Sequence, residues 1–81
     1  MRIGKTTSSS IEIQDGERVL KIEGEAFERG SGSPDFIIYA NSIREWQTPT
    51  GSVPISDEER KKIISFVIEE LSKRGWKITS E

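Results

Sequence analysis

Apolar and polar side chains alternate along two short segments near the start of the chain, residues 9–13 and 18–23. Asp15-Gly16 separates the segments, and Asp-Gly between alternating segments is a strong signal for a β-hairpin with a two-residue type I′ turn. A loop at these two positions would pair Ile11 with Leu20. The apolar side chains would then share one face of the hairpin: Ile11, Ile13, Leu20 and Ile22.

The middle of the chain predicts further strands. Residues 24–27 extend or restart a strand, and residues 36–39 form an apolar run without alternation, typical of a central strand covered on both faces. After a turn at 40–42, residues 43–47 return as a fourth strand or an irregular edge. The two prolines and the glycine in 48–54 rule out a central strand there.

The second half predicts one helix and a last strand. Ser56 at the N-cap and Glu59 at N3 form a reciprocal capping box, and Gly75 at C′ ends the helix, with Trp76 placed to pack on Leu71. The apolar positions recur at helical spacing, and they are Ile63, Ile64, Val67, Ile68 and Leu71. Four acid-first pairs follow the i,i+4 spacing: Asp57–Lys61, Glu58–Lys62, Glu69–Lys73 and Glu70–Arg74. Residues 76–80 alternate as a terminal strand.

These elements define the predicted fold class. We expect an α+β fold, a mainly antiparallel four- to five-stranded sheet with one helix in the C-terminal half packed on one face. Residues 1–8 are polar and unpatterned and are expected to be a flexible segment, followed by a single domain over 9–81.

Composition sets limits on this domain. The chain has 81 residues, and 12 of its apolar side chains are Ile, which favours a sheet and a small core. Without Cys, no disulfide can form and no thiolate can bind a metal or attack a substrate. No apolar run approaches the ~20 residues of a membrane span, so we expect a cytoplasmic protein.

Charge and chemistry disfavour two function classes. A net charge of −2 argues against nucleic-acid binding, which needs an excess of basic side chains on one face. His and Cys are both absent, so the commonest general base and the best nucleophile are missing, and we expect no enzyme. The acidic run 57–59 is explained by the helix N-terminus, and its side chains point in three directions. No catalytic residue, cofactor or metal is predicted.

The block 34–60 carries a resemblance to a known family. A buried-strand run is followed by Asn41-Ser42-Ile43-Arg44-Glu45-Trp46, a Pro-containing loop and the capped helix. This order resembles the small α+β immunity proteins encoded beside bacterial polymorphic toxins, over residues 35–78. The positions that match this family as scaffold residues are Ser42, Ile43, Trp46, Ser56 and Glu59.

The resemblance implies a function. Such a protein binds a cognate toxin domain and blocks it by stoichiometric occupation, without turnover or cofactor. The alternative is a small structural or regulatory adaptor that homodimerises through an open sheet edge or through Phe66. A long unprotected edge strand would favour self-association, whereas a clustered acidic face with protected edges would favour a different protein as partner.

Candidate partner-binding residues come from two segments. The N-terminal sheet region is locally acidic, which is either a solvated face or a carboxylate patch that attracts a basic toxin domain. Trp46 either closes the core or anchors an interface. Arg60 either packs its stem at the core edge and reaches a carboxylate or loop carbonyls, or contacts a partner directly. The predicted partner-binding set is Glu23, Glu25, Glu28, Arg44, Glu45 and Trp46.

Overall fold

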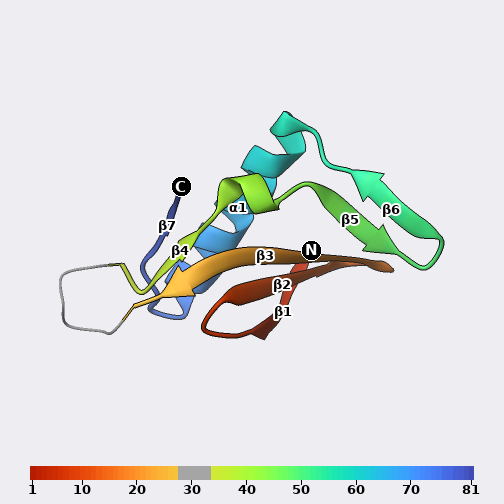
Figure 1. The fold of residues 1–81 in the computed structure, drawn as a ribbon. Helices are drawn as coiled ribbons and strands as arrows, with labels where there is room; N and C mark the ends of the chain where they lie inside the picture. Colours follow the sequence, from red (N-terminus) through yellow and green to blue (C-terminus); the bar gives the residue numbers. More distant parts are fainter. Residues whose placement is uncertain (28–33) are drawn as a thin grey trace.

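The computed structural model describes residues 1–27 and 34–81. The strands are β1 (Arg2–Thr6), β2 (Ser10–Asp15), β3 (Arg18–Ala26), β4 (Phe36–Ile38), β5 (Glu45–Thr48), β6 (Gly51–Pro54) and β7 (Ile78–Ser80), with a 3₁₀ helix η1 (Ala40–Ser42) and the helix α1 (Asp57–Lys73). They form one mostly antiparallel sheet with α1 across one face (Figure 1). The predicted α+β class is therefore confirmed, with seven strands in the described residues in place of four or five.

The long strand β3 organises the sheet. Along one edge it pairs with β2, and along the other it is shared between β5, at Val19↔Gln47, and β4, at Gly24–Ala26. We call the place where β4 and β5 part from β3 the fork. At the fork, the backbone amide of Glu23 donates to Ser42 Oγ at 3.0 Å, and the amide of Tyr39 donates to the carbonyl of Glu23 at 2.8 Å. The helix η1 thus replaces the missing strand partner.

The β2–β3 hairpin forms with the predicted faces but a different register. Ile13 pairs with Leu20 and Ile11 with Ile22, a shift of two residues from the expected Ile11–Leu20 pairing. The turn residues are Gly16 and Glu17 in place of Asp15-Gly16. Gly16 has a φ of 62° and no non-glycine residue described has a positive φ, so the turn has the pattern of type II′ rather than type I′. Because side chains alternate with a period of two, this shift leaves every side chain on its predicted face.

Part of the N-terminal segment, expected to be flexible over 1–8, forms a strand. Residues Arg2–Thr6 make β1, which pairs with β2 at Ile3↔Ile13 and Thr6↔Ile11. One extra residue on β1 between these pairs makes a β-bulge. Ile3 packs against the core, and this single apolar contact is too little pattern for a strand to be read from the sequence.

The predicted central strand, β4, is covered fully on one face only. Phe36 and Ile38 are fully buried, whereas Ile37 and Tyr39 are half-buried on the other face. The prediction of cover on both faces was wrong because, in the described residues, a helix lies on only one side of the sheet. The side chains of β4 therefore alternate in burial, although β3 and β7 flank the strand. The pairing with β7 is parallel.

The helix α1 begins and ends where predicted. Ser56 Oγ accepts from the amide of Glu59 at 3.1 Å. At the other end, the amide of Gly75 donates to Ser72 and that of Trp76 to Leu71, both to carbonyls, which with φ 84° at Gly75 is a Schellman motif.

The ion pairs of α1 differ from the predicted i,i+4 set. In the described residues the pairs within the helix are Asp57–Arg60 and Glu70–Lys73, both at i,i+3 spacing. Pairs at either spacing lie on the same side of a helix, so a rotamer choice decides between them.

The core lies between α1 and the helix-facing side of the sheet. Its members come from every strand except β1 and β6, and from the connections that flank β5 and α1. They are Ile11, Ile13, Leu20, Ile22, Phe36, Ile38, Ile43, Trp46, Ile55, Ile63, Val67, Leu71 and Ile78.

Gly24 is required by close packing on β3. A Cβ there would overlap the carbonyl oxygen of Ile37 and the ring of Phe36. We expect Gly24→Ala to lower the free energy of unfolding by at least about 2 kcal/mol, measured by urea denaturation. As the matched control, Gly4→Ala would meet mainly the flexible end of Glu12 and should change stability by less than about 0.5 kcal/mol. Equal effects of the two substitutions would contradict this account.

Candidate functional site

The face of the sheet opposite α1 carries the polar side chains of β3. Leu20 and Ile22 point into the core, so Lys21, Glu23 and Glu25 point to the other side, where no helix lies over the described residues (Figure 1). We call this side the open face.

A polar hollow opens at the fork. It has a volume of about 370 Å³ and is lined by Glu23, Asn41, Ser42 and Arg44. We call it the fork pocket. Ser42 Oγ forms part of its base, since it accepts from Glu23 N and donates to the carbonyl of Tyr39 at 2.7 Å. Nε of Arg44 donates to the carbonyl of Asn41 at 3.0 Å, which fixes the side chain across the turn.

The structure brings together four of the predicted partner-binding residues and places a fifth, Trp46, on the opposite side. Glu23 and Glu25 project from β3, and Arg44 lies beside Glu23 in the fork pocket. Glu45 follows on β5 and lies opposite the buried side of that strand. All four are exposed. Glu28 lies outside the described residues.

Tyr39 belongs to the same surface, although the sequence did not single it out. Its hydroxyl donates to Glu25 Oε2 at 3.1 Å. This hydrogen bond is the main cause that raises the pKa of Tyr39 above its ordinary value of 10.0, with smaller contributions from burial and from the charges of Glu25 and Glu81. The alternation Phe36–Ile38 inward and Ile37–Tyr39 outward would have revealed this position, had the β3–β4 pairing been known.

Trp46 lies on the opposite side and is buried, with 1% of its surface exposed. Its indole Nε1 donates to Glu59 Oε1 on α1 at 3.2 Å, and the guanidinium of Arg18 lies 4.4 Å above the ring centroid. The carboxylate of Glu59 therefore holds Trp46 rather than completing the predicted capping box. Of the two alternatives for Trp46, the one in which it closes the core agrees with this placement. A substitution of Trp46 would then affect a partner only through a change in β5.

Arg60 and Phe66 both pack at the margins of the core. Arg60 Nε donates to the carbonyl of Ile43 at 3.0 Å and its guanidinium pairs with Asp57, as the structural interpretation of this arginine expected. Phe66 is half-buried and packs against the core cluster, so it fills a side gap more than it presents an apolar contact surface.

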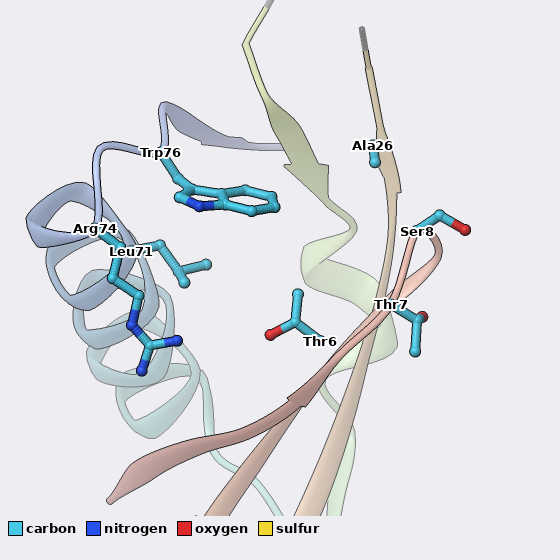
Figure 2. A pocket seen from close by; sticks show the side chains of 7 residues that line it. All are labelled: Thr6, Thr7, Ser8, Ala26, Leu71, Arg74 and Trp76. Carbon is cyan, nitrogen blue, oxygen red and sulfur yellow. The ribbon is translucent and has the colours of Figure 1, made fainter. Parts of the chain in front are cut away.

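A second hollow, of about 410 Å³, is lined in part by Ala26 at the end of β3. Figure 2 shows Leu71, Arg74 and Trp76 on one side of it and Thr6–Ser8 with Ala26 on the other. It is the mostly apolar gap between the end of α1 and the β1–β2 connection. The lining offers hydroxyls but no neighbouring base to activate one.

Neither a metal-binding cluster nor a membrane-spanning helix is found in the described residues. No group of three or more His, Cys, Asp or Glu side chains is placed to hold a metal ion there. No helix in that part of the chain is long and apolar enough to span a membrane.

Fold and surface define a class: a small α+β protein with an uncovered polar face on its sheet. A comparison with protein-family models is more specific. The model described as Immunity protein 74 matches residues 3–81, nearly the whole chain, and the chain belongs to this family. The resemblance to immunity proteins is thereby confirmed. Searches of curated proteins and of solved structures found no match.

The Trp46–Glu59 hydrogen bond should stabilise the fold measurably. Trp46→Phe keeps most of the apolar volume but removes the indole N–H and weakens the contact with Arg18. We expect the free energy of unfolding to fall by about 1–2 kcal/mol, measured by urea denaturation. In a double-mutant cycle with Glu59→Ala, the two effects should not add, because both remove the same bond. Full additivity would contradict the role of this bond.

Asp15 should contribute to stability against acid. Its hydrogen bond with Arg18 is the main cause that lowers the pKa of Asp15 below its ordinary value of 3.8, against a smaller opposing effect of burial. Because the folded-state pKa is lowered, the stabilisation is present above about pH 3.8 and is lost as the pH falls through the folded-state value. Between about pH 6 and about pH 2, urea denaturation should show a shallower loss for Asp15→Asn than for the unmodified chain. Parallel curves would contradict this assignment.

Proposed function

We propose that this chain is a bacterial immunity protein that binds its cognate toxin domain and inhibits it by stoichiometric occupation, in the cytoplasm of the cell that makes both. The observation that carries the proposal is the family match over residues 3–81, which suggests a toxin-inhibiting role and a protein partner. Immunity protein families are generally non-enzymatic. The mechanism is therefore binding alone, with no turnover, cofactor or metal.

The open face around the fork is the surface that we assign to the toxin. Glu23, Glu25 and Glu45 are exposed there, and none of them forms an ion pair with a described residue. Uncompensated carboxylates attract a basic partner and speed its association. A toxin whose active site binds an anionic substrate would present such a basic surface, and occupation of that surface would exclude the substrate.

The rest of the scaffold supports this surface from behind. Trp46 fixes β5 to α1 through Glu59, and Arg60 binds the carbonyl of Ile43, immediately before Arg44. A surface that is already ordered loses less conformational entropy when it binds. The fork residues are thus presented in a fixed arrangement.

The sheet edges favour a different protein as partner over a second copy of the chain. Among the described strands, the edge strand β1 carries a β-bulge in its pairing with β2, β6 ends in Pro54, and β7 has three residues. Bulges, prolines and short strands are the devices that prevent edge-to-edge pairing. The adaptor alternative needed a long unprotected edge, so this observation weakens it.

The proposal is tested with the toxin domain encoded beside the gene. Both chains are expressed in a host that the toxin domain alone kills, and the purified proteins are mixed at increasing ratios. We expect restored growth and inhibition of the toxin that is complete at one equivalent, with a 1:1 complex in size-exclusion chromatography with light scattering.

Two controls decide the interpretation. A catalytically inactive toxin variant should still form the 1:1 complex, which shows that inhibition comes from binding and not from modification of the toxin. Unchanged toxicity, together with separate elution of the two chains, would overturn the proposed function. Inhibition at far less than one equivalent would instead indicate turnover.

A further inference from the structure

We propose that the fork pocket receives a basic side chain of the toxin domain, and that an acidic side chain beside it on the toxin pairs with Arg44. This inference rests on the proposed function and names the chemistry of its contact. It concerns the pocket lined by Glu23, Asn41, Ser42 and Arg44.

The pocket keeps two opposite charges apart. Glu23 and Arg44 line the same hollow, yet they form no ion pair within 4.0 Å in the described part of the chain. Arg44 is held by its Nε, which donates to the carbonyl of Asn41, and its guanidinium forms no ion pair with a described residue. Both charges are therefore available to complementary charges on a partner.

The walls of the pocket are already fixed. Ser42 Oγ accepts from the amide of Glu23 and donates to the carbonyl of Tyr39, and the amide of Ile43 donates to the carbonyl of Ala40 at 3.1 Å. These bonds satisfy the backbone at the fork without using the carboxylate of Glu23 or the amide of the Asn41 side chain. A partner can bind to these groups without first breaking an internal contact.

The carboxylates at the fork favour the binding of a positively charged group. Glu23 and Glu25 are two residues apart on β3 and share the open face, so their charges add at this end of the strand. The hydroxyl of Tyr39 donates to Glu25 at 3.1 Å. An ammonium or guanidinium group entering the pocket would meet an acceptor from Glu23 and the carbonyl oxygen of the Asn41 side chain.

Elsewhere on the open face, polar side chains have other neighbours, and Glu12 accepts a hydrogen bond from Gln14 at 3.0 Å. Toward β1, Glu12 faces Lys21 across the β2–β3 register, and Arg2 donates to Gln14 at 2.6 Å. In that region an incoming charge would displace an existing contact. At the fork, the carboxylate of Glu23 and the side-chain amide of Asn41 form no hydrogen bond or ion pair in the part of the chain that the structure describes, which is why we place the contact there.

The positions of the two opposite charges in the pocket also favour one orientation of the partner. A carboxylate on one wall and a guanidinium on the other match a partner that presents the two charges in one order and repel the reverse order. This pair would let the chain discriminate its own toxin from a related domain of similar shape.

The test measures affinity for the toxin domain encoded beside the gene. Glu23→Lys and Arg44→Glu each reverse one wall, and Lys62→Glu and Glu69→Lys are matched charge reversals on the exposed side of α1. We expect each fork variant to raise Kd at least about tenfold and to slow association at low salt, with both helix variants within about twofold of the unmodified chain. Thermal unfolding of each variant confirms that the fold is kept.

A second measurement avoids substitutions. Hydrogen exchange of the unmodified chain, with and without the toxin domain, should slow at the exposed amides of residues 41–45 and leave those on the outer side of α1 unchanged. Charge reversal of the toxin residues at this footprint should restore binding of Glu23→Lys or Arg44→Glu.

The outcomes separate the two proposals. If the unmodified chain forms the complex while both fork variants bind within about twofold of it, the fork contact is overturned and the proposed function stands. Slowed hydrogen exchange confined to α1 would likewise overturn the fork contact and leave the proposed function standing. If the unmodified chain neither binds nor protects, the proposed function fails and the fork contact falls with it.

Discussion

The burial of one tryptophan between β3 and α1 is the constraint on which the rest of the structure depends. Strand β5 pairs with β3 at a single position, Val19↔Gln47, so backbone hydrogen bonds contribute little to holding β5 against β3. Trp46 supplies what is missing: it packs in the core, receives Arg18 on its ring and binds Glu59 on α1. These contacts tie β5, one arm of the fork, to α1 and to β3.

The structure assigns separate tasks to its two sides. The helix-facing side contains the apolar core, and Gly24 marks how closely it is packed, since even a methyl group there would overlap Phe36. The open face carries the groups available to a partner. At the fork, η1 satisfies the backbone through Ser42 and leaves the carboxylate of Glu23 unengaged by the described residues.

Local patterns predicted what local forces determine. The ends of α1 follow from Ser56 and Gly75, whose capping geometry involves only neighbours in sequence. The hairpin faces were predicted, but the register was wrong because Gly16 and Glu17, rather than Asp15 and Gly16, occupy the two turn positions. The fork was not predictable, since it brings residues 23 and 42 together. The candidate site therefore emerged from the sequence as two separate segments, one with Glu23, Glu25 and Glu28 and one over residues 44–46, and without Tyr39.

The alternation of inward and outward side chains between η1 and β5 has an evolutionary consequence. Ser42, Ile43 and Trp46 make the internal contacts of the fork, whereas Asn41 and Arg44 project from the same short stretch to the surface. Exposed positions that make few internal contacts change stability little when they are substituted. Mutations can therefore exchange the groups on the rim one at a time while the fold persists, so a lineage could acquire a new specificity without passing through an unfolded intermediate.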